Sequence, residues 1–192
     1  KMKYKPMLAY PVSSKPIDYS KPVYMQPKLD GVRCLIQCDK GQVTAYSRTG
    51  KVWKNINHIL EELAFFFQKY PNVVLDGELY NHDFRDDFES IISMVRKTKP
   101  TDEDRRISAL NVQFHCYDMV NKRMKFSTRD KWLASNLPLG FGIKKVKTQV
   151  IDESKYSLTT GDMIAKSKHT QNLLDGYEGS IVRLDTPYQC KR

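Results

Sequence analysis

The chain has 192 residues, of which 40% are hydrophobic and 28% are charged. These proportions exclude a collagen-like, wholly disordered or disulfide-stapled chain, and no apolar run is long enough to predict a membrane span. The 32 Lys and Arg residues outnumber the 22 Asp and Glu residues and give a net charge of +10, which favours polyanionic partners because bound phosphates release condensed counterions.

The first 22 residues contain four prolines, which predict an extended arm that wraps a single domain. Alternating apolar residues predict strands over 32–38, 42–47, 72–80, 111–120, 144–151 and 179–184. Helical spacing predicts amphipathic helices over 56–67, 84–95 and 160–174, and a sequence like a capping box predicts a short helix opening at Ser127. Because strands and helices interleave and hairpins are present, we expect an α+β fold with antiparallel sheets flanked by helices.

The four cysteines are scattered and form neither a CxxC pair nor a cluster with the spacing of zinc ligands. We therefore expect free thiols and a reducing, intracellular location. The four histidines are equally scattered, and none is a candidate site residue. Neither of the common glycine-rich phosphate loops is present, so a bound nucleotide would be held in another way.

The segment Gln26-Pro27-Lys28-Leu29-Asp30-Gly31-Val32-Arg33 is chemically distinctive. Lys28 stands before an Asp-Gly pair, between two apolar strands, and a lysine placed in this way can point into a cleft. The pair is also common in hairpin turns, in which case Lys28 would be an ordinary solvated strand lysine. The local sequence leaves both interpretations open.

Five short motifs, in one order, resemble those of the covalent nucleotidyltransferases, which are the DNA ligases, RNA ligases and mRNA capping enzymes. The segment from Lys28 to Arg33 resembles the K-x-D-G-x-R motif of that superfamily. The later elements are Ser47-Arg48-Thr49-Gly50, Asp76-Gly77-Glu78, Phe114-His115-Cys116-Tyr117-Asp118 and Glu178-Gly179-Ser180-Ile181-Val182-Arg183. The resemblance implies an ATP-grasp-like nucleotidyltransferase fold over residues 1–192.

Two features of the resemblance favour one branch, the adenylation domain of small viral, phage or bacterial ATP-dependent DNA ligases. Glu178-Gly179 matches the ligases, whereas capping enzymes usually carry Asp-Gly at this place. Lys28 follows only 27 residues, which is too few for the extra module of NAD-dependent ligases, so the resemblance implies ATP.

The resemblance assigns roles around the nucleotide. Lys28 would attack the α-phosphorus of ATP and carry AMP as a phosphoramidate. Gln26 would read the adenine edge, and Arg33 would bind the ribose or the phosphates. Tyr117 would stack on the base, with Phe114 as its substitute, although simple core packing is the alternative for Tyr117.

Further roles concern the metal and the nick. Glu178 would bind Mg²⁺ or Mn²⁺ and orient the lysine, and Glu78 would hold the ribose hydroxyls or help to place the metal. Arg48 would contact the 5′-phosphate of the nick, unless it is only a turn residue. Arg183, also counted among the DNA contacts, would support the site around Glu178.

In the family, a fifth motif with two lysines and a C-terminal OB-fold domain follow. Lys191-Arg192 resembles the residues just before that motif, so we expect a domain cut short, with reduced adenylation and sealing on its own. The expected function is sealing of nicked double-stranded DNA by a monomer, in replication, repair or recombination. The alternatives are an RNA ligase, a capping guanylyltransferase, or a non-catalytic basic nucleic-acid-binding domain.

Overall fold

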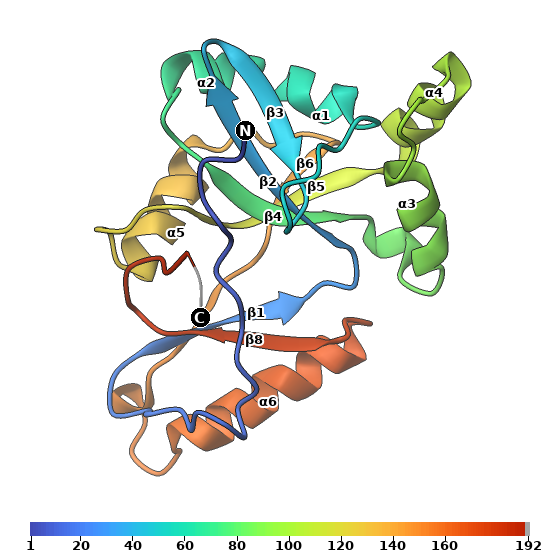
Figure 1. Ribbon diagram of the computed structural model, residues 1–192. Helices are drawn as coiled ribbons and strands as arrows, with labels where there is room; N and C mark the ends of the chain where they lie inside the picture. Colours follow the sequence, from blue (N-terminus) through green and yellow to red (C-terminus); the bar gives the residue numbers. More distant parts are fainter. Residues whose placement is uncertain (191–192) are drawn as a thin grey trace.

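Two β-sheets of unequal size organise the chain in a computed structural model, which describes residues 1–190 (Figure 1). The larger sheet has the order β3-β2-β4-β5-β6 and the smaller one the order β7-β1-β8. The strands are β1 (Val23–Lys28), β2 (Val32–Asp39), β3 (Gln42–Tyr46), β4 (Leu75–Tyr80), β5 (Gln113–Met119), β6 (Ile143–Lys145), β7 (Gln149–Ile151) and β8 (Gly179–Arg183). All neighbouring strands pair antiparallel except β5 and β6, which run parallel.

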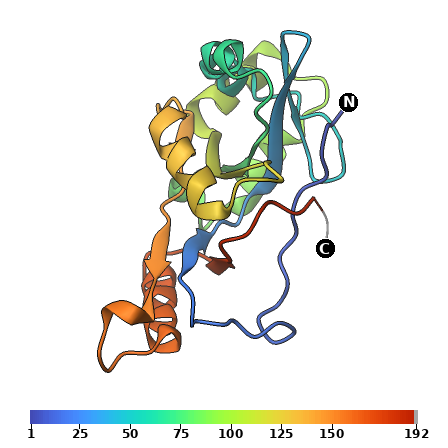
Figure 2. The ribbon, with the colours of Figure 1, turned by 90° about the vertical axis from the view of Figure 1, so that its left-hand side faces the viewer.

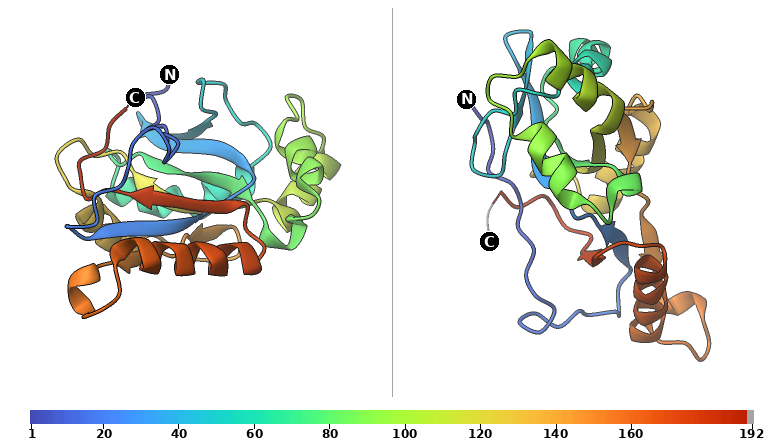
Figure 3. Two further views of the ribbon diagram at one scale, coloured as in Figure 1. Left: turned by 90° about the horizontal axis from the view of Figure 1, so that it is seen from below. Right: turned by 90° about the vertical axis from the view of Figure 1, so that its right-hand side faces the viewer.

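Helices flank both sheets, so the predicted mixed α+β architecture is confirmed. They are α1 (Asn57–Glu62), α2 (Ala64–Lys69), α3 (Phe88–Val95), α4 (Asp102–Asn111), α5 (Phe126–Asn136) and α6 (Gly161–Leu174), with 3₁₀ turns η1 (His82–Phe84) and η2 (Glu153–Lys155). Helix α6 packs on the small sheet, and the other helices surround the large one (Figure 1). Seen from below, β1 and β8 lie side by side along α6 (Figure 3).

Two apolar cores correspond to the two sheets. The main core lies between the large sheet and its helices and includes Leu63, Phe67 and Leu79, each at most 1% exposed. The smaller core joins β1 and β7 to α6, for example through Met25 and Ile164. Apolar residues alternate along β1, so one face of this strand packs on α6 while the other faces the large sheet.

The chain crosses between the sheets at two places that sequence periodicity did not predict. The strand expected over 144–151 is two strands, because β6 pairs with β5 whereas β7 pairs with β1. Leu29–Gly31 connects β1 to β2, which belong to different sheets, so Asp30-Gly31 is not a hairpin turn. A Cβ atom on Gly31 would lie 2.2 Å from the carbonyl oxygen of Leu79, so only glycine fits this crossing.

Helix ends also differ from the expectation. The helix expected over 56–67 is divided at Leu63 into α1 and α2. The capping box expected at Ser127 is wrong, because this serine donates hydrogen bonds to Asp185 from its backbone nitrogen and its hydroxyl. A true capping box pairs Thr101 with Asp104 and opens α4, a helix that the sequence reading missed.

The N-terminal arm is extended, as expected, and passes both sheets (Figure 2). The Lys3 backbone nitrogen donates to Gln37 Oε1 at 2.7 Å, and Gln37 Nε2 donates to the Lys1 carbonyl at 2.7 Å. The Met7 nitrogen donates to the hydroxyl of Tyr188 at 2.8 Å, which ties the arm to the segment after β8. All four cysteines are free thiols. Among the described residues, no helix is long and apolar enough to cross a membrane.

The first prediction concerns Arg129, whose buried guanidinium neutralises the buried carboxylate of Asp118. Nε and Nη2 donate to the Asp118 carboxylate at 2.8 and 3.1 Å. The Arg129→Ala substitution should lower the free energy of unfolding by about 3–5 kcal/mol, because a buried charge loses a partner. Urea denaturation measures the change.

The matched control for this prediction is Arg106→Ala, which breaks an exposed, two-hydrogen-bond contact with Glu103. The urea midpoint of the control should be nearly unchanged because water screens exposed ion pairs. Equal midpoints for the two variants would contradict the structural role of Arg129.

Candidate active site

Lys28 and Glu178 face each other across two neighbouring strands. Strands β1 and β8 pair so that Lys28 lies opposite Gly179, and Lys28 Nζ is 3.3 Å from Glu178 Oε1. The two side chains are 50% and 46% exposed, so a ligand can reach both. The nearby Asp30 has its pKa raised by partial burial and by the Glu178 carboxylate. The structure thus brings together an accessible amine and a cluster of carboxylates.

The ring of Tyr117 lies close to two arginines. The guanidinium carbons of Arg33 and Arg183 are 5.5 and 5.1 Å from its centroid. The register of β4 and β5 shifts at this point, because Gly77 pairs with Cys116 whereas Asp76 pairs with Asp118. Tyr117 is therefore the extra residue of a bulge, a feature that redirects a side chain within a strand.

Glu78 extends from β4 toward this ring. The Tyr117 hydroxyl donates to Glu78 Oε1 at 3.0 Å. Burial raises the pKa of Glu78 to about 7, although the Tyr117 hydrogen bond and the charge of Arg33 oppose that rise. A carboxyl group with this pKa is partly protonated at neutral pH.

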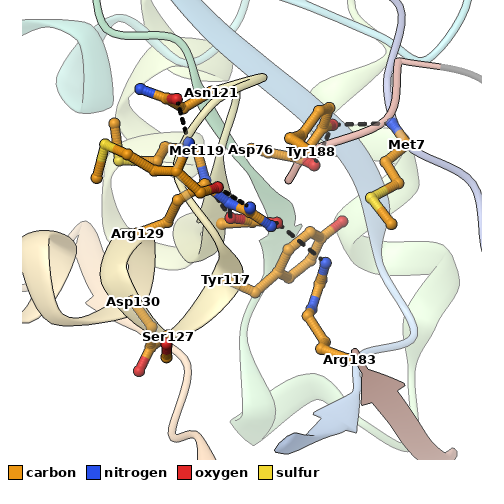
Figure 4. A network of polar contacts seen from close by, with 12 residues as sticks. Met7, Asp76, Tyr117, Met119, Asn121, Ser127, Arg129, Asp130, Arg183 and Tyr188 are labelled. Atoms are coloured by element: carbon orange, nitrogen blue, oxygen red, sulfur yellow. Dashed lines mark hydrogen bonds and ion pairs between the residues drawn. The ribbon is translucent and has the colours of Figure 1, made fainter. Parts of the chain in front are cut away.

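Arg33 stabilises a buried carboxylate in addition to its contact with the Tyr117 ring. Its Nε and Nη2 each donate to the fully buried carboxylate of Asp76 at 2.7 Å, and Nη2 also donates to the Met7 carbonyl at 2.8 Å. The Tyr188 hydroxyl donates to the same carboxylate at 2.7 Å. Figure 4 shows Asp76, Tyr188 and Met7 of this cluster together with Tyr117, Arg183 and Arg129.

Buried Gln26 is hydrogen-bonded to the partly buried Arg183, and this corrects the prediction for Gln26. Gln26 is 1% exposed, and its Nε2 donates to the Tyr117 carbonyl at 2.9 Å and to Thr148 Oγ1 at 3.0 Å. Arg183 Nε donates to Gln26 Oε1 at 2.7 Å, and Arg183 Nη1 donates to Asp118 at 3.2 Å. In this conformation Gln26 cannot contact an adenine edge directly. Arg183 uses Nε and Nη1 inside the protein, and its contact with DNA stays a prediction.

Phe114 also requires a correction. It is fully buried in the main core, and a Cβ atom on Gly77 would lie 2.7 Å from its Cε1. Tyr117 packs instead against the separate cluster of Leu29, Tyr80 and Val146, so the two rings lie in different surroundings. The structure therefore contradicts the prediction that Phe114 can replace Tyr117 in stacking on a base.

Arg48 is exposed in the turn that follows β3. The Ser47 nitrogen donates to the Lys51 carbonyl at 2.7 Å, and Gly50 closes the turn with a φ of +92°. The turn leaves the guanidinium at the protein surface. Its contact with a nick phosphate stays a prediction.

A histidine that sequence reasoning set aside holds the loop before Glu178. The His82 ring stacks on Tyr177, with centroids 4.2 Å apart, and His82 Nε2 is 2.8 Å from the Asp175 carbonyl. Because a carbonyl only accepts, Nε2 carries the proton, and Nδ1 accepts from the Tyr80 hydroxyl at 2.6 Å. No local sequence signal links these residues, since η1 and the loop after α6 are distant in the chain.

The carboxylates fit a sparse magnesium site. In residues 1–190, no group of three or more His, Cys, Asp or Glu side chains could hold a metal ion alone. Mg²⁺, however, commonly takes one or two carboxylates together with waters and substrate phosphates. The half-exposed Glu178 offers hard oxygen ligands of this kind.

Comparisons with known proteins agree with this geometry. A family model described as the ATP dependent DNA ligase domain matches residues 6–192, so the chain belongs to that family. It is the nucleotidyltransferase, or adenylation, domain of ATP-dependent DNA ligases. A comparison with curated proteins gives no match.

Solved structures share the fold at low sequence identity. The structure called Pmar-Lig has a TM-score of 0.76 at 22% identity, covering 98% of this chain and 45% of that one. A Lig E DNA ligase has a TM-score of 0.67 at 21% identity, covering 100% and 66%. The ATP complex of bacteriophage T7 ATP-dependent DNA ligase has a TM-score of 0.68 at 17% identity, covering 99% and 66%.

The likeness extends beyond DNA ligases. An archaeal ATP-dependent RNA ligase matches with a TM-score of 0.58 at 17% identity, covering 86% of this chain and 40% of that one. This chain spans less than half the length of Pmar-Lig. The fifth motif and the OB-fold domain stay predictions, and Lys191 and Arg192 lie outside the described residues.

The second prediction concerns the acidity of Glu78. In the metal-free protein, its carboxyl carbon should titrate with a pKa of about 7 in ¹³C NMR, with Glu78→Gln used to assign the signal. Because the folded pKa lies above the unfolded value, this group's contribution to stability falls as pH rises from about 4.5 to about 7. Glu78→Gln should remove that loss.

The control variant is Tyr117→Phe, which deletes the hydroxyl that donates to Glu78. The pKa of Glu78 should then rise further, because the hydrogen bond to the ionised form is gone. A carboxyl that titrates at the ordinary glutamate value in both proteins would contradict the burial effect.

Proposed function

We propose that this domain transfers AMP from ATP to Lys28 and that the longer protein seals 5′-phosphate/3′-hydroxyl nicks in double-stranded DNA. The observation that carries the proposal is the accessible Lys28–Glu178 pair, 3.3 Å apart. The family match supports the chemistry independently, because it covers residues 6–192.

The first step forms one bond and breaks another. Uncharged Lys28 Nζ attacks the α-phosphorus, the bond to the bridging oxygen of the β-phosphate breaks, and pyrophosphate leaves. Lysine loses its protons to solvent or a nearby base, so the product is a phosphoramidate-linked AMP. Glu178 orients the amine for the attack.

Other residues would bind the nucleotide around this bond. Two guanidinium groups lie close to the Tyr117 ring, so its prediction as a stacking residue requires a base to fit beside Arg33 and Arg183. Glu78 would accept from the ribose hydroxyls. When bound, Mg²⁺ would neutralise charge on the triphosphate, held by Glu178 with Glu78 as a second candidate.

The later steps act on the nick. AMP passes from Lys28 to the 5′-phosphate, and the 3′-hydroxyl then attacks that phosphorus and expels AMP. Arg48 would bind the 5′-phosphate, since it is exposed in its turn. We propose a monomer acting on nicked DNA, in replication, repair or recombination.

An RNA ligase is the second candidate, because the archaeal RNA ligase shares the fold. Matched nicked duplexes with DNA or RNA strands separate the two activities. If only the nicked RNA is sealed, the proposed substrate is RNA and the protein is an RNA ligase.

The third prediction tests the nucleophile. The chain is incubated with Mg²⁺ and α-labelled ATP or GTP and then denatured. ATP label should remain on the parent chain and on Lys21→Ala, an exposed lysine control, and should be absent from Lys28→Ala. The label should be released by acid, because phosphoramidates are acid-labile.

Other labelling results change the proposal. Label from GTP in place of ATP would favour a capping enzyme. If neither nucleotide labels this chain, the assay is repeated on a chain extended past Arg192. Absence of label there would exclude covalent nucleotidyl transfer and favour a non-catalytic nucleic-acid-binding domain.

A further inference from the structure

A second concave surface lies away from Lys28, at the free edge of the large sheet. This groove has a volume of about 500 Å³ and lies between β3, the segment leading into α1, and the connection from α3 to α4. Its lining residues are Gln42, Val43, Thr44, Ala45, Val52, Trp53, Lys54, Asn57, Leu60, Thr98, Lys99, Pro100 and Arg105. None of them belongs to the Lys28 site, which lies at the end of β1 in the other sheet (Figure 1).

The charge of this basic groove is entirely positive. Lys54, Lys99 and Arg105 line it, and no aspartate or glutamate does. Asp87, Glu89 and Asp104 line a separate cavity between α3 and α4, and Asp102 and Glu103 in the first turn of α4 line neither cavity. The charged side chains that a ligand in the groove would meet are therefore cations.

The backbone that carries these cations is fixed by hydrogen bonds. Arg105 Nη1 donates to the Lys54 carbonyl at 3.4 Å, and the next residue, buried Asn55, donates to the carbonyls of Met94 and Asp104 at 2.9 and 3.2 Å. The Trp53 nitrogen donates to the Ala45 carbonyl at 3.0 Å. The wall that carries Lys54 and Arg105 is therefore preformed, and binding a ligand there mainly has to order the lysine side chains.

The basic groove continues the turn that carries Arg48. Tyr46 and Val52 pair across the base of that turn, and Val52 lines the groove. The hydroxyls of Thr44 and Thr98 add neutral donors among the cations. Cations and hydroxyls together on a rigid edge suit phosphodiester oxygens, which accept hydrogen bonds and carry one negative charge per phosphate.

We propose that the basic groove binds the phosphodiester backbone of duplex DNA at a distance from the reacting phosphate. It would give this domain a DNA-binding surface whose affinity does not depend on lysyl-AMP formation. The choice of DNA as the ligand rests on the proposed function, whereas the binding of a polyanion rests on the groove alone.

The fourth prediction tests DNA binding by the basic groove with the double variant Lys54→Ala/Lys99→Ala. Fluorescence anisotropy measures binding to a nicked DNA duplex at several salt concentrations. The affinity should fall, and the slope of log K against log salt should become shallower by about 1 per lysine, because fewer counterions are released. The matched control Lys155→Ala/Lys166→Ala removes two exposed lysines elsewhere and should keep the parent slope.

The outcomes separate this inference from the proposed function. Equal slopes for the two double variants, with equal melting temperatures, would overturn the basic groove as a DNA contact. Lys28 labelling by ATP needs no DNA and is scored separately. A chain that is never labelled but still shows the groove-dependent slope would refute the adenylation proposal and keep this one.

Discussion

Two buried carboxylates lie opposite each other at the centre of the large sheet, and the site depends on how their charges are neutralised. Asp76 on β4 pairs with Asp118 on β5, and neither is exposed. Like charges at such a position oppose folding unless each has a cationic partner. Arg33 neutralises Asp76, while Arg129 and Arg183 share Asp118. Burial of these two carboxylates therefore requires arginine side chains within ion-pair distance.

These arginines also build the site. Arg183 comes from the small sheet, and its ion pair with Asp118 joins that sheet to the large one. Arg33 and Arg183 both lie close to the Tyr117 ring, and the Tyr117 hydroxyl donates to Glu78. The last arginine of the first motif and the last arginine of the final motif thus support the residues that would bind the nucleotide.

The sequence predicted that Lys28 and Glu178 lie in one site better than it predicted their surroundings. The motifs indicated both residues, and pairing of β1 with β8 places them together. Burial of Gln26 was unpredictable because its partner Arg183 is 157 residues away. The segment 144–151 gave no sign that it divides between two sheets, since valine or isoleucine is interspersed with polar residues in both halves. Helix α4 was missed because it buries little apolar surface and so lacks a clear helical periodicity, although its acidic first turn is itself a helix start signal.

The exposure of the Lys28–Glu178 pair follows from what the site has to do. An exposed ion pair contributes at most about 1 kcal/mol, so this contact cannot hold the strands in place. The β1–β8 ladder, the Arg183 ion pair and the stacking of His82 on Tyr177 hold them instead. Because the fold does not depend on the Lys28–Glu178 contact, a nucleotide can separate the amine from the carboxylate without a large loss of stability. The buried ion pairs supply rigidity, and the exposed pair stays accessible to a ligand.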